Sequence, residues 1–440
     1  MLKKFYPIRN RRFSNGAWVI SVSMGYGHQR TAFPLKDLAF EGKIMAANNY
    51  QGIPDKDRKI WEMSRKFYES ISRFKRIPLI GNIAFSVYDE FQKILSFYPK
   101  RDLSQPNLQL HQIYSLIKKG WGRDLIERLK KKPLPLISTF FTPAFMAEIF
   151  NYPKNIFCVV CDADVSRTWA PLNPRQSKIK YFAPTERVAE RLKLYGIKPG
   201  NIFLTGYPLP KDNVSTTLPV EKLEILKYDL SHRLLNLDPK RKYQKQYGTL
   251  IERYLGKLPN QSNHPLTIMF TVGGAGAQKE IGTKIIESLA KKIKGERVKI
   301  ILVAGIREKI KEYLLRHIKS LDLENKNTEI LFEKDIDKYF KSFNLALKTT
   351  DILWTKPSEL SFYTALGLPI IIAPPIGSQE DLNQEWLLRL GSGMRQENPA
   401  YTDQWLFDLL ETGWFAEAAF QGFIEGEKMG TFNIEKIIGK

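Results

Sequence analysis

The chain has 440 residues, of which 43% are hydrophobic and 26% are charged, a composition typical of globular proteins and unlike that of disordered chains. Its formal net charge of +22 favours anionic partners, namely nucleic acid, an anionic membrane surface or phosphorylated substrates. No apolar stretch approaches the roughly 18 residues that a spanning helix needs, and residues 1–15 are too basic and polar for a secretory signal. We therefore expect a cytoplasmic protein. Because a domain usually has ~100 to 200 residues, we also expect the chain to form two domains.

The first half of the chain, residues 1–210, has the pattern of a doubly wound α/β domain, in which short β-like runs alternate with helical stretches. The strands are expected at residues 18–22, 136–138, 156–161, 180–183 and 202–205. After the first strand, Gly25, Gly27 and His28 lead into a helix. Such a turn leaves backbone N–H groups for anions or polar hydroxyls, although a tight turn with an incidental histidine explains the same residues equally well.

A basic helical region is predicted at about residues 52–107. From Lys56 to Arg76 eight cations stand against three anions, apolar residues repeat at helical spacing, and Lys59, Lys66 and Arg73 recur seven residues apart on another face. This pattern is typical of a helix lying in a membrane interface, where anionic lipid contributes on the order of 1 kcal/mol per cation. Packing of the apolar stripe against the domain is an equal alternative. The candidates for membrane contact are Lys59, Trp61, Lys66, Phe67, Arg73 and Phe74.

The sequence argues against a nucleic acid partner and against a metal site at its two cysteines. No helix-turn-helix, RNP-type or zinc-finger pattern accompanies the charge, so we expect no nucleic acid partner. Cys158 and Cys161 lie within the expected strand 156–161, where residues three apart point to opposite faces of the sheet. We therefore interpret them as two core thiols and expect no metal site there.

The second half of the chain begins with a charged helical linker or insertion at residues 211–262. A second doubly wound domain follows at residues 263–402, with strands expected at 266–271, 298–303, 328–332, 352–355 and 369–373. Helices in residues 403–440 are expected to pack back on the N-terminal domain. The fold class is thus α/β, with two Rossmann-like domains facing a cleft, and ligands are expected beyond the carboxyl ends of the strands.

Three polar turns in the second half are suited to a phosphate and to ribose or sugar hydroxyls. Gly273, Gly274 and Gly276 follow a strand and open a helix, so backbone N–H groups can approach a phosphate, although neither a Walker loop nor a dinucleotide fingerprint is present. The other two turns carry polar side chains that suit ribose or sugar hydroxyls. These side chains are Lys356, Ser358 and Glu359 in one turn and Gln379, Glu380 and Asn383 in the other.

In chain order these motifs resemble those of one family of inverting glycosyltransferases, similar to glycosyltransferase family 28. It includes plant monogalactosyldiacylglycerol synthase, bacterial diacylglycerol glucosyltransferases and the lipid II-forming N-acetylglucosaminyltransferase, all with the GT-B fold. The matching segments are Gly25-x-Gly27-His28-x-x-Thr31-Ala32, Val159-Val160-Cys161-Asp162 with Trp169, Ala183-Pro184-Thr185-Glu186 through Gly206-Tyr207-Pro208, Gly273-Gly274-x-Gly276, and Gly367-Leu368-Pro369 with Gln379-Glu380-x-x-Asn383. The second segment resembles a Val-Val-Thr-Asp sequence of the family.

The resemblance implies transfer of a hexose from a nucleotide-diphosphate sugar, with a uridine diphosphate sugar as the expected donor, to a lipid or lipid-linked acceptor. Gln379 and Glu380 would hold the donor sugar, Asn383 would support their loop, and the three loop glycines would border the diphosphate. The acceptor-side loop would contain Gly25, Gly27 and His28. Direct displacement needs a base, for which His28, Asp162 and Asp164 are the candidates, and no cofactor or metal is expected. The protein would act from the cytoplasm, as a peripheral protein on the inner face of the membrane.

Two departures from the family pattern keep alternatives open. Phe362 stands where the family usually has a ribose-binding Glu, for which Glu359 is the candidate substitute, and Ser166 stands where the diacylglycerol branch has a His. A sugar-nucleotide 2-epimerase on the same fold would need no acceptor. A catalytically inactive binding protein would bind the nucleotide without turnover.

Overall fold

The structure is a computed structural model that describes residues 16–74, 94–271 and 278–439, with the side chains of residues 67–74 and 378 outside the description. The chain forms two compact units. The N-terminal unit contains the described residues up to Leu209 together with Ile376–Asn383 and Met429–Lys440, and the C-terminal unit contains Pro210–Pro375 and Gln384–Lys428. Within the described residues no helix is both long and apolar enough to span a bilayer.

The N-terminal unit is built on a parallel sheet of six strands. Their order is β2 (Met45–Ala46), β1 (Trp18–Ser21), β3 (Leu136–Ser138), β4 (Ile156–Val159), β5 (Lys180–Ala183) and β6 (Ile202–Leu204). The inner strands are short apolar runs, because a parallel sheet is covered on both faces. From β1 the chain moves outward to β2 and then returns to β3 on the other side of β1, so the switch point of the sheet lies between β1 and β3.

Helices cover this sheet on both faces. On one face α1 (Gly27–Ala32), the 3₁₀ helix η1 (Phe33–Leu38) and α16 (Gly430–Ile438) pack into a core with Val19, Ile137, Val159 and Ile434. Right-handed crossovers place α6 (Phe141–Ile149) on the opposite face, where it packs on β3 and β4 with α4 (Leu108–Lys118) and α5 (Arg123–Lys130) beside it. Helix α7 (Glu186–Leu194) packs on β5 and β6.

Helix α2 (Asp55–Phe74) is attached to this unit by its first turns. The Asp57 carboxylate accepts a hydrogen bond from the Gly122 amide at 3.1 Å, and the Trp61 and Trp121 rings meet edge to face at 4.7 Å between centroids. Regular helix is described up to residue 74, and residues 94–107 contain no helix, so the helical region expected at 52–107 is shorter within the described residues.

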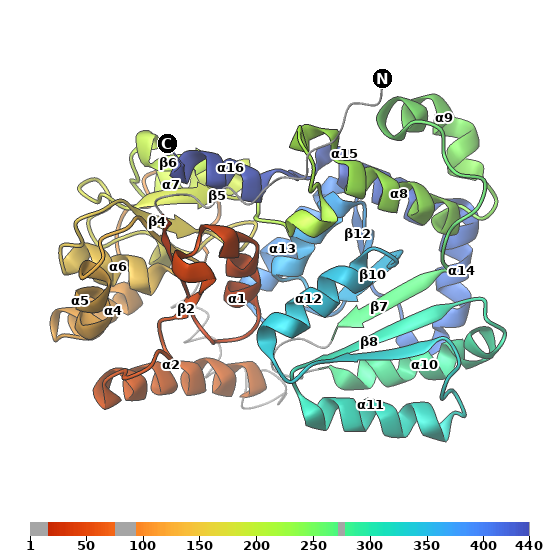
Figure 1. Ribbon diagram of the computed structural model, residues 1–440, viewed down its shortest axis with the longest axis horizontal. Helices are drawn as coiled ribbons and strands as arrows, with labels where there is room; N and C mark the ends of the chain where they lie inside the picture. Colours follow the sequence, from red (N-terminus) through yellow and green to blue (C-terminus); the bar gives the residue numbers. More distant parts are fainter. Residues whose placement is uncertain (1–15, 75–93, 272–277, 440) are drawn as a thin grey trace. The chain divides into compact units, whose positions relative to one another are not determined.

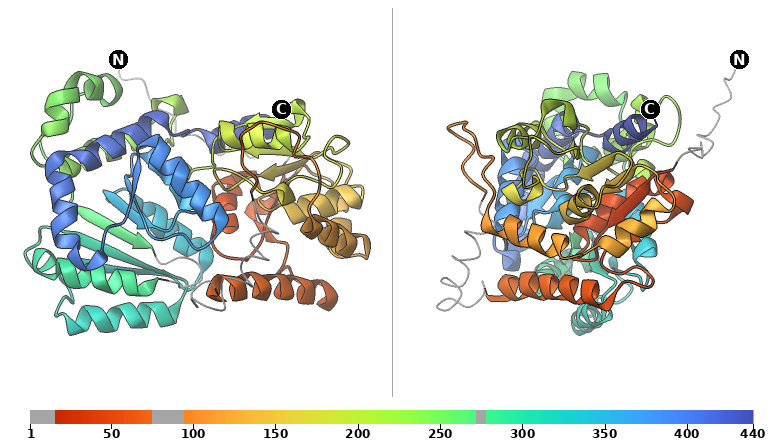
Figure 2. Two further views of the ribbon diagram at one scale, coloured as in Figure 1. Left: turned by 180° about the vertical axis from the view of Figure 1, so that it is seen from behind. Right: turned by 90° about the vertical axis from the view of Figure 1, so that its left-hand side faces the viewer.

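The C-terminal unit contains a second parallel sheet of six strands (Figure 1). Their order is β12 (Gly393–Arg395), β11 (Ile370–Ile372), β10 (Ile352–Thr355), β7 (Thr267–Thr271), β8 (Lys299–Gly305) and β9 (Thr328–Phe332). Helices α10 (Lys279–Lys294) and α11 (Glu308–Ser320) lie side by side against it in Figures 1 and 2. The switch point lies between β7 and β10. The two sheets confirm the predicted fold class of two doubly wound α/β units.

Residues 211–262 are an integral part of the C-terminal unit, which differs from the expected linker. Helix α8 (Glu224–Leu237) carries Arg233, whose fully buried guanidinium donates to the carbonyl oxygens of Leu347, Thr350 and Leu366 at 2.7 to 3.1 Å. Leu347 ends α12 (Ile336–Leu347), Leu366 ends η7 (Glu359–Leu366), and Thr350 lies just before β10. A buried cation that satisfies these three carbonyls fixes α8 in place. Helix α9 (Lys242–Leu255) packs beside α8.

The C-terminal helices also divide differently from the expectation that residues 403–440 pack on the N-terminal domain. Helices α14 (Thr402–Thr412) and α15 (Trp414–Glu425) belong to the C-terminal unit, where α15 packs on α8 and on the 3₁₀ helix η7 (Glu359–Leu366). Only α16 belongs to the N-terminal unit. Thr431 and Asn433 of α16 donate to the carbonyl oxygens of Leu209 and Thr205 at 2.5 and 2.9 Å.

Candidate functional site

The turn after β1 places His28 at the switch point of the N-terminal sheet. Gly25 has a φ of +110°, a backbone conformation that side chains with a Cβ rarely adopt, so a glycine is required at this point of the turn. Helix α1 then starts at Gly27, whose carbonyl oxygen accepts from the Thr31 hydroxyl at 2.8 Å. His28 therefore stands in the first turn of α1 and lies beside the residues that follow β3.

The hydrogen bonds of His28 determine its tautomer. Nδ1 lies 2.8 Å from the carbonyl oxygen of Thr139, the residue after β3, and a carbonyl can only accept. Nδ1 therefore carries a proton, and in the neutral ring Nε2 is the nitrogen that can accept one. The Thr139 hydroxyl donates in return to the His28 carbonyl at 2.9 Å. The Phe140 ring meets the imidazole edge to face at 4.8 Å, and the Trp169 ring lies at 6.3 Å.

Cys161 lies against the same imidazole, which corrects the strand expected at 156–161. Strand β4 ends at Val159, so Cys161 belongs to the loop that follows it. Its Sγ is 3.4 Å from His28 Nδ1 and 3.9 Å from Asp162 Oδ2. Both cysteines are buried free thiols, and complete burial raises the pKa of Cys158 well above its usual value. Cys158 is a core residue, as predicted, whereas Cys161 is both buried and in contact with a candidate base.

Asn383 binds the loop that carries Asp162. Its Oδ1 accepts from the Ala163 amide at 2.7 Å, and its Nδ2 donates to Asp162 Oδ1 at 3.0 Å. Asn383 is fully buried and belongs to helix α13 (Ser378–Leu390), whose first residues are part of the N-terminal unit. The structure thus brings Asn383, Asp162, Cys161 and His28 together.

Asp164 is placed differently from Asp162. Its two carboxylate oxygens receive the Arg191 guanidinium at 2.9 and 2.8 Å, and the Val165 amide donates to one of them. Both side chains are almost completely buried. Arg191 also donates to the Leu95 carbonyl at 2.7 Å, so the ion pair ties the loop after β4 to the segment after residue 93.

The turn that begins α13 contains Gln379 and Glu380. Glu380 is 8% exposed, and its Oε2 accepts from the Ile376 amide at 2.7 Å, while its own amide donates to the Gly377 carbonyl at 3.0 Å. The carboxylate therefore closes the turn at the start of the helix, in the same unit as Asn383. Gln379 is partly exposed.

The C-terminal unit places its predicted residues around its own switch point. Gly273, Gly274 and Gly276 lie outside the described residues. On either side of them, Thr271 Oγ1 donates to Thr355 Oγ1 at 2.7 Å, joining the ends of β7 and β10, and Gln278 donates to the Pro374 carbonyl at 2.8 Å. The turn after β10 carries Lys356 and Ser358, both partly exposed, and Glu359, which is buried where η7 begins.

Two residues of the Gly-Leu-Pro region have structural roles. Phe362, at the position of the expected ribose-binding carboxylate, is buried and packs on Trp386 with ring centroids 5.1 Å apart. Gly367 has a φ of +68°, and a Cβ there would lie 2.6 Å from Leu230 Cδ1. This glycine is needed for the close approach of α8, so its presence follows from packing.

The candidates for membrane contact separate into three groups. Lys59 and Lys66 are exposed on α2. Trp61 is only 4% exposed and packs on Trp121, with Phe140 at 6.4 Å, so its prediction as a membrane-facing residue is wrong. Large aromatic rings on a helix pack inward where a partner is available, as here. The side chains of Phe67, Arg73 and Phe74 lie outside the described residues.

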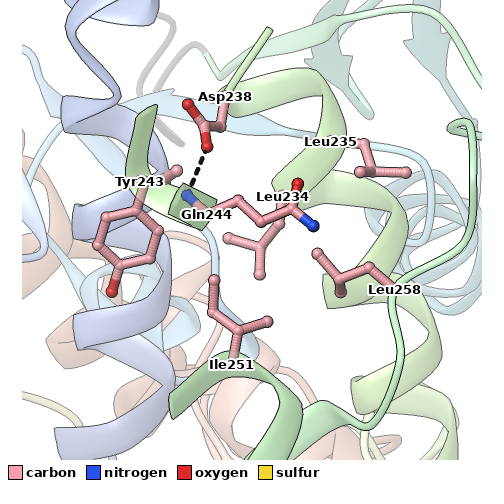
Figure 3. A pocket seen from close by; sticks show the side chains of 8 residues that line it. Leu234, Leu235, Asp238, Tyr243, Gln244, Ile251 and Leu258 are labelled. Carbon is pink, nitrogen blue, oxygen red and sulfur yellow. Dashed lines mark hydrogen bonds between the residues drawn. The ribbon is translucent and has the colours of Figure 1, made fainter. Parts of the chain in front are cut away.

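A pocket in the C-terminal unit is not a candidate site (Figure 3). It is lined by side chains that include Leu234 of α8, Ile251 of α9 and Leu258, which follows α9, and it has room for no more than about one water molecule. The hydrogen bond drawn in Figure 3 runs from the backbone N–H of Gln244 to Asp238 Oδ2, at 2.8 Å. Helices, not the loops that follow strands, form this pocket. Among the described residues, no group of three or more His, Cys, Asp or Glu side chains has an arrangement that could hold a metal ion.

Known proteins are similar to parts of this chain. Residues 257–329 match a family described as a domain of unknown function, DUF6938. Over 242 residues the sequence is 23% identical to the processive diacylglycerol beta-glucosyltransferase of Bacillus subtilis (strain 168), covering 54% of this chain and 50% of that protein. The match thus spans about half the length of this relative. It confirms the resemblance to glycosyltransferases that the sequence motifs indicated.

Solved structures are similar at a lower level. MurG of Acinetobacter baumannii is 13% identical, with a TM-score of 0.44 over 77% of this chain and 81% of that chain. A glycosyltransferase of Rickettsia africae ESF-5 is 15% identical, with a TM-score of 0.41 over 96% and 97% of the two chains. A putative UDP-N-acetylglucosamine 2-epimerase of Listeria monocytogenes is 12% identical, with a TM-score of 0.43 over 76% and 80%. With TM-scores below 0.5, these likenesses add no argument about activity.

Sequence reasoning missed two residues at this site. Thr139 supplies the carbonyl that determines the His28 tautomer, and Cys161 was interpreted as a core thiol. The position of Thr139 directly after β3 was a usable signal, because β1 and β3 are neighbours on either side of the switch point. That position indicates that Thr139 lies near His28. Its residue type does not reveal the hydrogen bond, because the backbone carbonyl makes it.

Proposed function

We propose that this protein is a glycosyltransferase that moves a hexose from a uridine diphosphate sugar to a lipid or lipid-linked acceptor at a membrane surface. The sequence similarity to a diacylglycerol glucosyltransferase supports the reaction class and the lipid acceptor. The observation that carries the proposal is the His28 imidazole at the switch point, with its Nδ1 proton held by the Thr139 carbonyl. This arrangement prepares Nε2 to take a proton from an acceptor hydroxyl.

The proposed step is a single displacement that inverts the anomeric carbon. The acceptor oxygen forms a bond to that carbon as its proton passes to His28 Nε2, and the bond to the diphosphate oxygen breaks with its electron pair leaving on the nucleotide diphosphate. Gln379 and Glu380 would hold the donor hydroxyls, as the family resemblance implies. Asp162 is the second candidate base, being partly exposed, whereas both Asp164 oxygens are occupied by Arg191.

The leaving diphosphate needs positive or dipolar stabilisation. We infer that backbone N–H groups of the loop at Gly273, Gly274 and Gly276, the first turn of α10 and the Lys356 ammonium supply it without a metal ion. Ser358 and Glu359 follow Lys356 and would contact the ribose, with Glu359 in place of the carboxylate that Phe362 replaces. Addition of a chelator should leave the rate unchanged.

The test combines a binding screen with a turnover assay. Thermal shifts with a panel of nucleotide sugars identify the donor, because a ligand at 100 times its Kd that binds only the folded state adds roughly 2.7 kcal/mol of stability. Nucleotide diphosphate release is then measured with vesicles that contain diacylglycerol. We expect release only with both substrates, and a loss of about 10²- to 10⁴-fold in His28→Gln with donor binding retained.

Other outcomes would overturn the proposal. Interconversion of the nucleotide sugar without acceptor would identify a 2-epimerase. Donor binding with no turnover over a broad panel of acceptors would identify a binding protein. Turnover that is unchanged in His28→Gln would reject His28 as the base and leave Asp162 to be tested by Asp162→Asn.

A further inference from the structure

We propose that the Cys161 thiol is a positioning group that connects the His28 imidazole to the Asp162 carboxylate, and through it to Asn383 of α13. The catalytic consequence of this connection rests on the proposed function, in which His28 is the base. The connection itself is a property of the N-terminal unit and does not depend on which substrates the protein uses.

The contacts form one continuous polar chain. His28 Nδ1 lies 3.4 Å from Cys161 Sγ, Sγ lies 3.9 Å from Asp162 Oδ2, and Asp162 Oδ1 lies 3.0 Å from Asn383 Nδ2. His28 lies in the first turn of α1, after β1, and Cys161 and Asp162 lie in the loop after β4. Asn383 comes from a helix more than 200 positions later in the chain.

The direction of each hydrogen bond follows from chemistry. The Thr139 carbonyl requires a proton on Nδ1, and that N–H is shared with Sγ as a second acceptor. The Cys161 S–H is then the donor toward the Asp162 carboxylate, which can only accept while ionised. The Asn383 amide donates to the other carboxylate oxygen. These contacts therefore have mutually consistent directions from the His28 ring to Asn383, and hydrogen bonds in such a chain polarise one another.

The Cys161 thiol is buried in the loop after β4. Cys161 is 4% exposed and lies outside β4, so its side chain neither faces solvent nor belongs to the sheet. Phe140 and Trp169 border the imidazole with uncharged rings, and the Cys161 thiol lies against its Nδ1. Cys158 offers the contrast, since it is a fully buried thiol of β4 whose neighbours in the backbone ladder are Ser138 and Tyr181.

The chain of contacts gives α13 an influence on the base. Gln379 and Glu380, which would hold the donor sugar, lie one turn before Asn383 in the same helix. A shift of this turn on donor binding would move the Asn383 amide, change the hydrogen bonding of Asp162 and alter how strongly the thiol and carboxylate stabilise a protonated imidazole. Cys161 would thereby couple the occupied donor site to the basicity of His28.

The experiment is an NMR titration of the full-length protein labelled in its histidine rings, of which there are only five to assign. Titration curves are compared for the wild type, Cys161→Ala, Cys161→Ser and the matched control Cys158→Ala, with His28→Gln used for assignment. A charge within ~4–6 Å changes a pKa by about 1 to 3 units. For the relayed contact we expect Cys161→Ala to lower the titration midpoint of His28 by about half a unit or more.

The serine variant separates positioning from packing. A hydroxyl can accept from Nδ1 and donate to the carboxylate as the thiol does, so Cys161→Ser should restore the midpoint, and Cys158→Ala should leave it unchanged. Equal shifts in Cys161→Ala and Cys158→Ala, or no recovery in Cys161→Ser, would overturn the proposal. Since the titration needs no turnover, it can succeed where the proposed function fails, and the reverse also holds.

Discussion

The two aspartates after β4 illustrate how neighbouring carboxylates acquire different roles. Asp162 is partly exposed, and one of its oxygens accepts from the Asn383 amide. Asp164 is 4% exposed, and both of its oxygens are held by the Arg191 guanidinium. Asp164 is thus held in place by a buried bidentate ion pair, whereas the Asn383 amide binds Asp162 without a charge of its own.

Removing the cation of the buried pair should destabilise the protein strongly. We expect Arg191→Met to lower the free energy of unfolding by about 3 to 5 kcal/mol, because it leaves the Asp164 carboxylate buried without its partner. Urea unfolding followed by circular dichroism measures this change. The control is Lys193→Met, which removes an exposed ion pair with Glu190 from the same helix and should cost no more than about 1 kcal/mol. Equal losses in the two variants would contradict the structural role of Asp164.

The residue scale also shows how much of the site was predictable. His28, Asp162 and Asn383 were selected because they follow strand ends, and the structure brings them together. The different roles of Asp162 and Asp164 were not predictable, because they depend on partners distant in sequence, such as Arg191 for Asp164. The identity of Trp61 as a core residue likewise depends on Trp121, which lies 60 positions later.

At the scale of elements, ten of the twelve strands in the described part of the chain were predicted, and the edge strands β2 and β12 were not. The strands at 136–138, 180–183, 328–332 and 352–355 match the structure at both ends. Strands β2 and β12 were missed, since two or three residues at a sheet edge need no apolar run and carry no periodicity. The helices of residues 403–440 were predicted as one group, but their division depends on surface complementarity that periodicity does not encode.

The contact of α16 with the N-terminal unit depends on a glycine. A Cβ at Gly430 would collide with the Tyr207 carbonyl, a backbone atom that cannot move aside easily. We expect Gly430→Ala to destabilise the protein by about 1 to 3 kcal/mol, as overpacked sites do. Thermal unfolding measures this change, with Gly200→Ala as the control, because an added Cβ there meets nothing within 4 Å. A stability of Gly430→Ala equal to that of the control would show that α16 can shift at no cost.

Helix α8 contains a carboxyl group that should make stability depend on pH. Burial raises the pKa of Asp229 to about 6, although Arg233 acts in the opposite direction. The unfolded value is near 4, so between about pH 4 and 6 the folded state holds a proton that the unfolded state has lost. Stability from this group is therefore complete at low pH and is lost as the pH rises through about 6.

The variant Asp229→Asn should remove this dependence. The quantity to compare is the free energy of unfolding of the variant minus that of the wild type. We expect this difference to be about 2 kcal/mol larger at pH 7.5 than at pH 4. Urea unfolding at the two pH values gives the difference. Asp212→Asn, which makes the same substitution at an exposed carboxylate, serves as the control. Parallel curves for wild type and Asp229→Asn would show that burial does not raise the pKa of Asp229 in the folded state.

At the scale of the whole molecule, the net charge of +22 needs to be distinguished from the particular surface that α2 presents. In its described side chains, the exposed cations Lys56, Arg58, Lys59, Arg65 and Lys66 outnumber the exposed anions Asp55 and Glu62. Met63 adds an apolar side chain that is 64% exposed beside them. An anionic lipid surface attracts basic side chains and can also bury an apolar one, so this combination on α2 favours a lipid surface more than net charge by itself would.

Vesicle flotation distinguishes these two sources of attraction. We expect binding to vesicles of phosphatidylglycerol at low salt, little binding to phosphatidylcholine, and a loss of binding as the salt concentration rises. The double variant Lys59→Glu with Lys66→Glu should weaken binding at least about 30-fold, because each cation contributes on the order of 1 kcal/mol. The control is Lys131→Glu with Lys178→Glu, two exposed lysines outside α2 whose replacement changes the net charge equally. A similar loss in both double variants would mean that overall charge, and not α2, attracts the protein to the membrane.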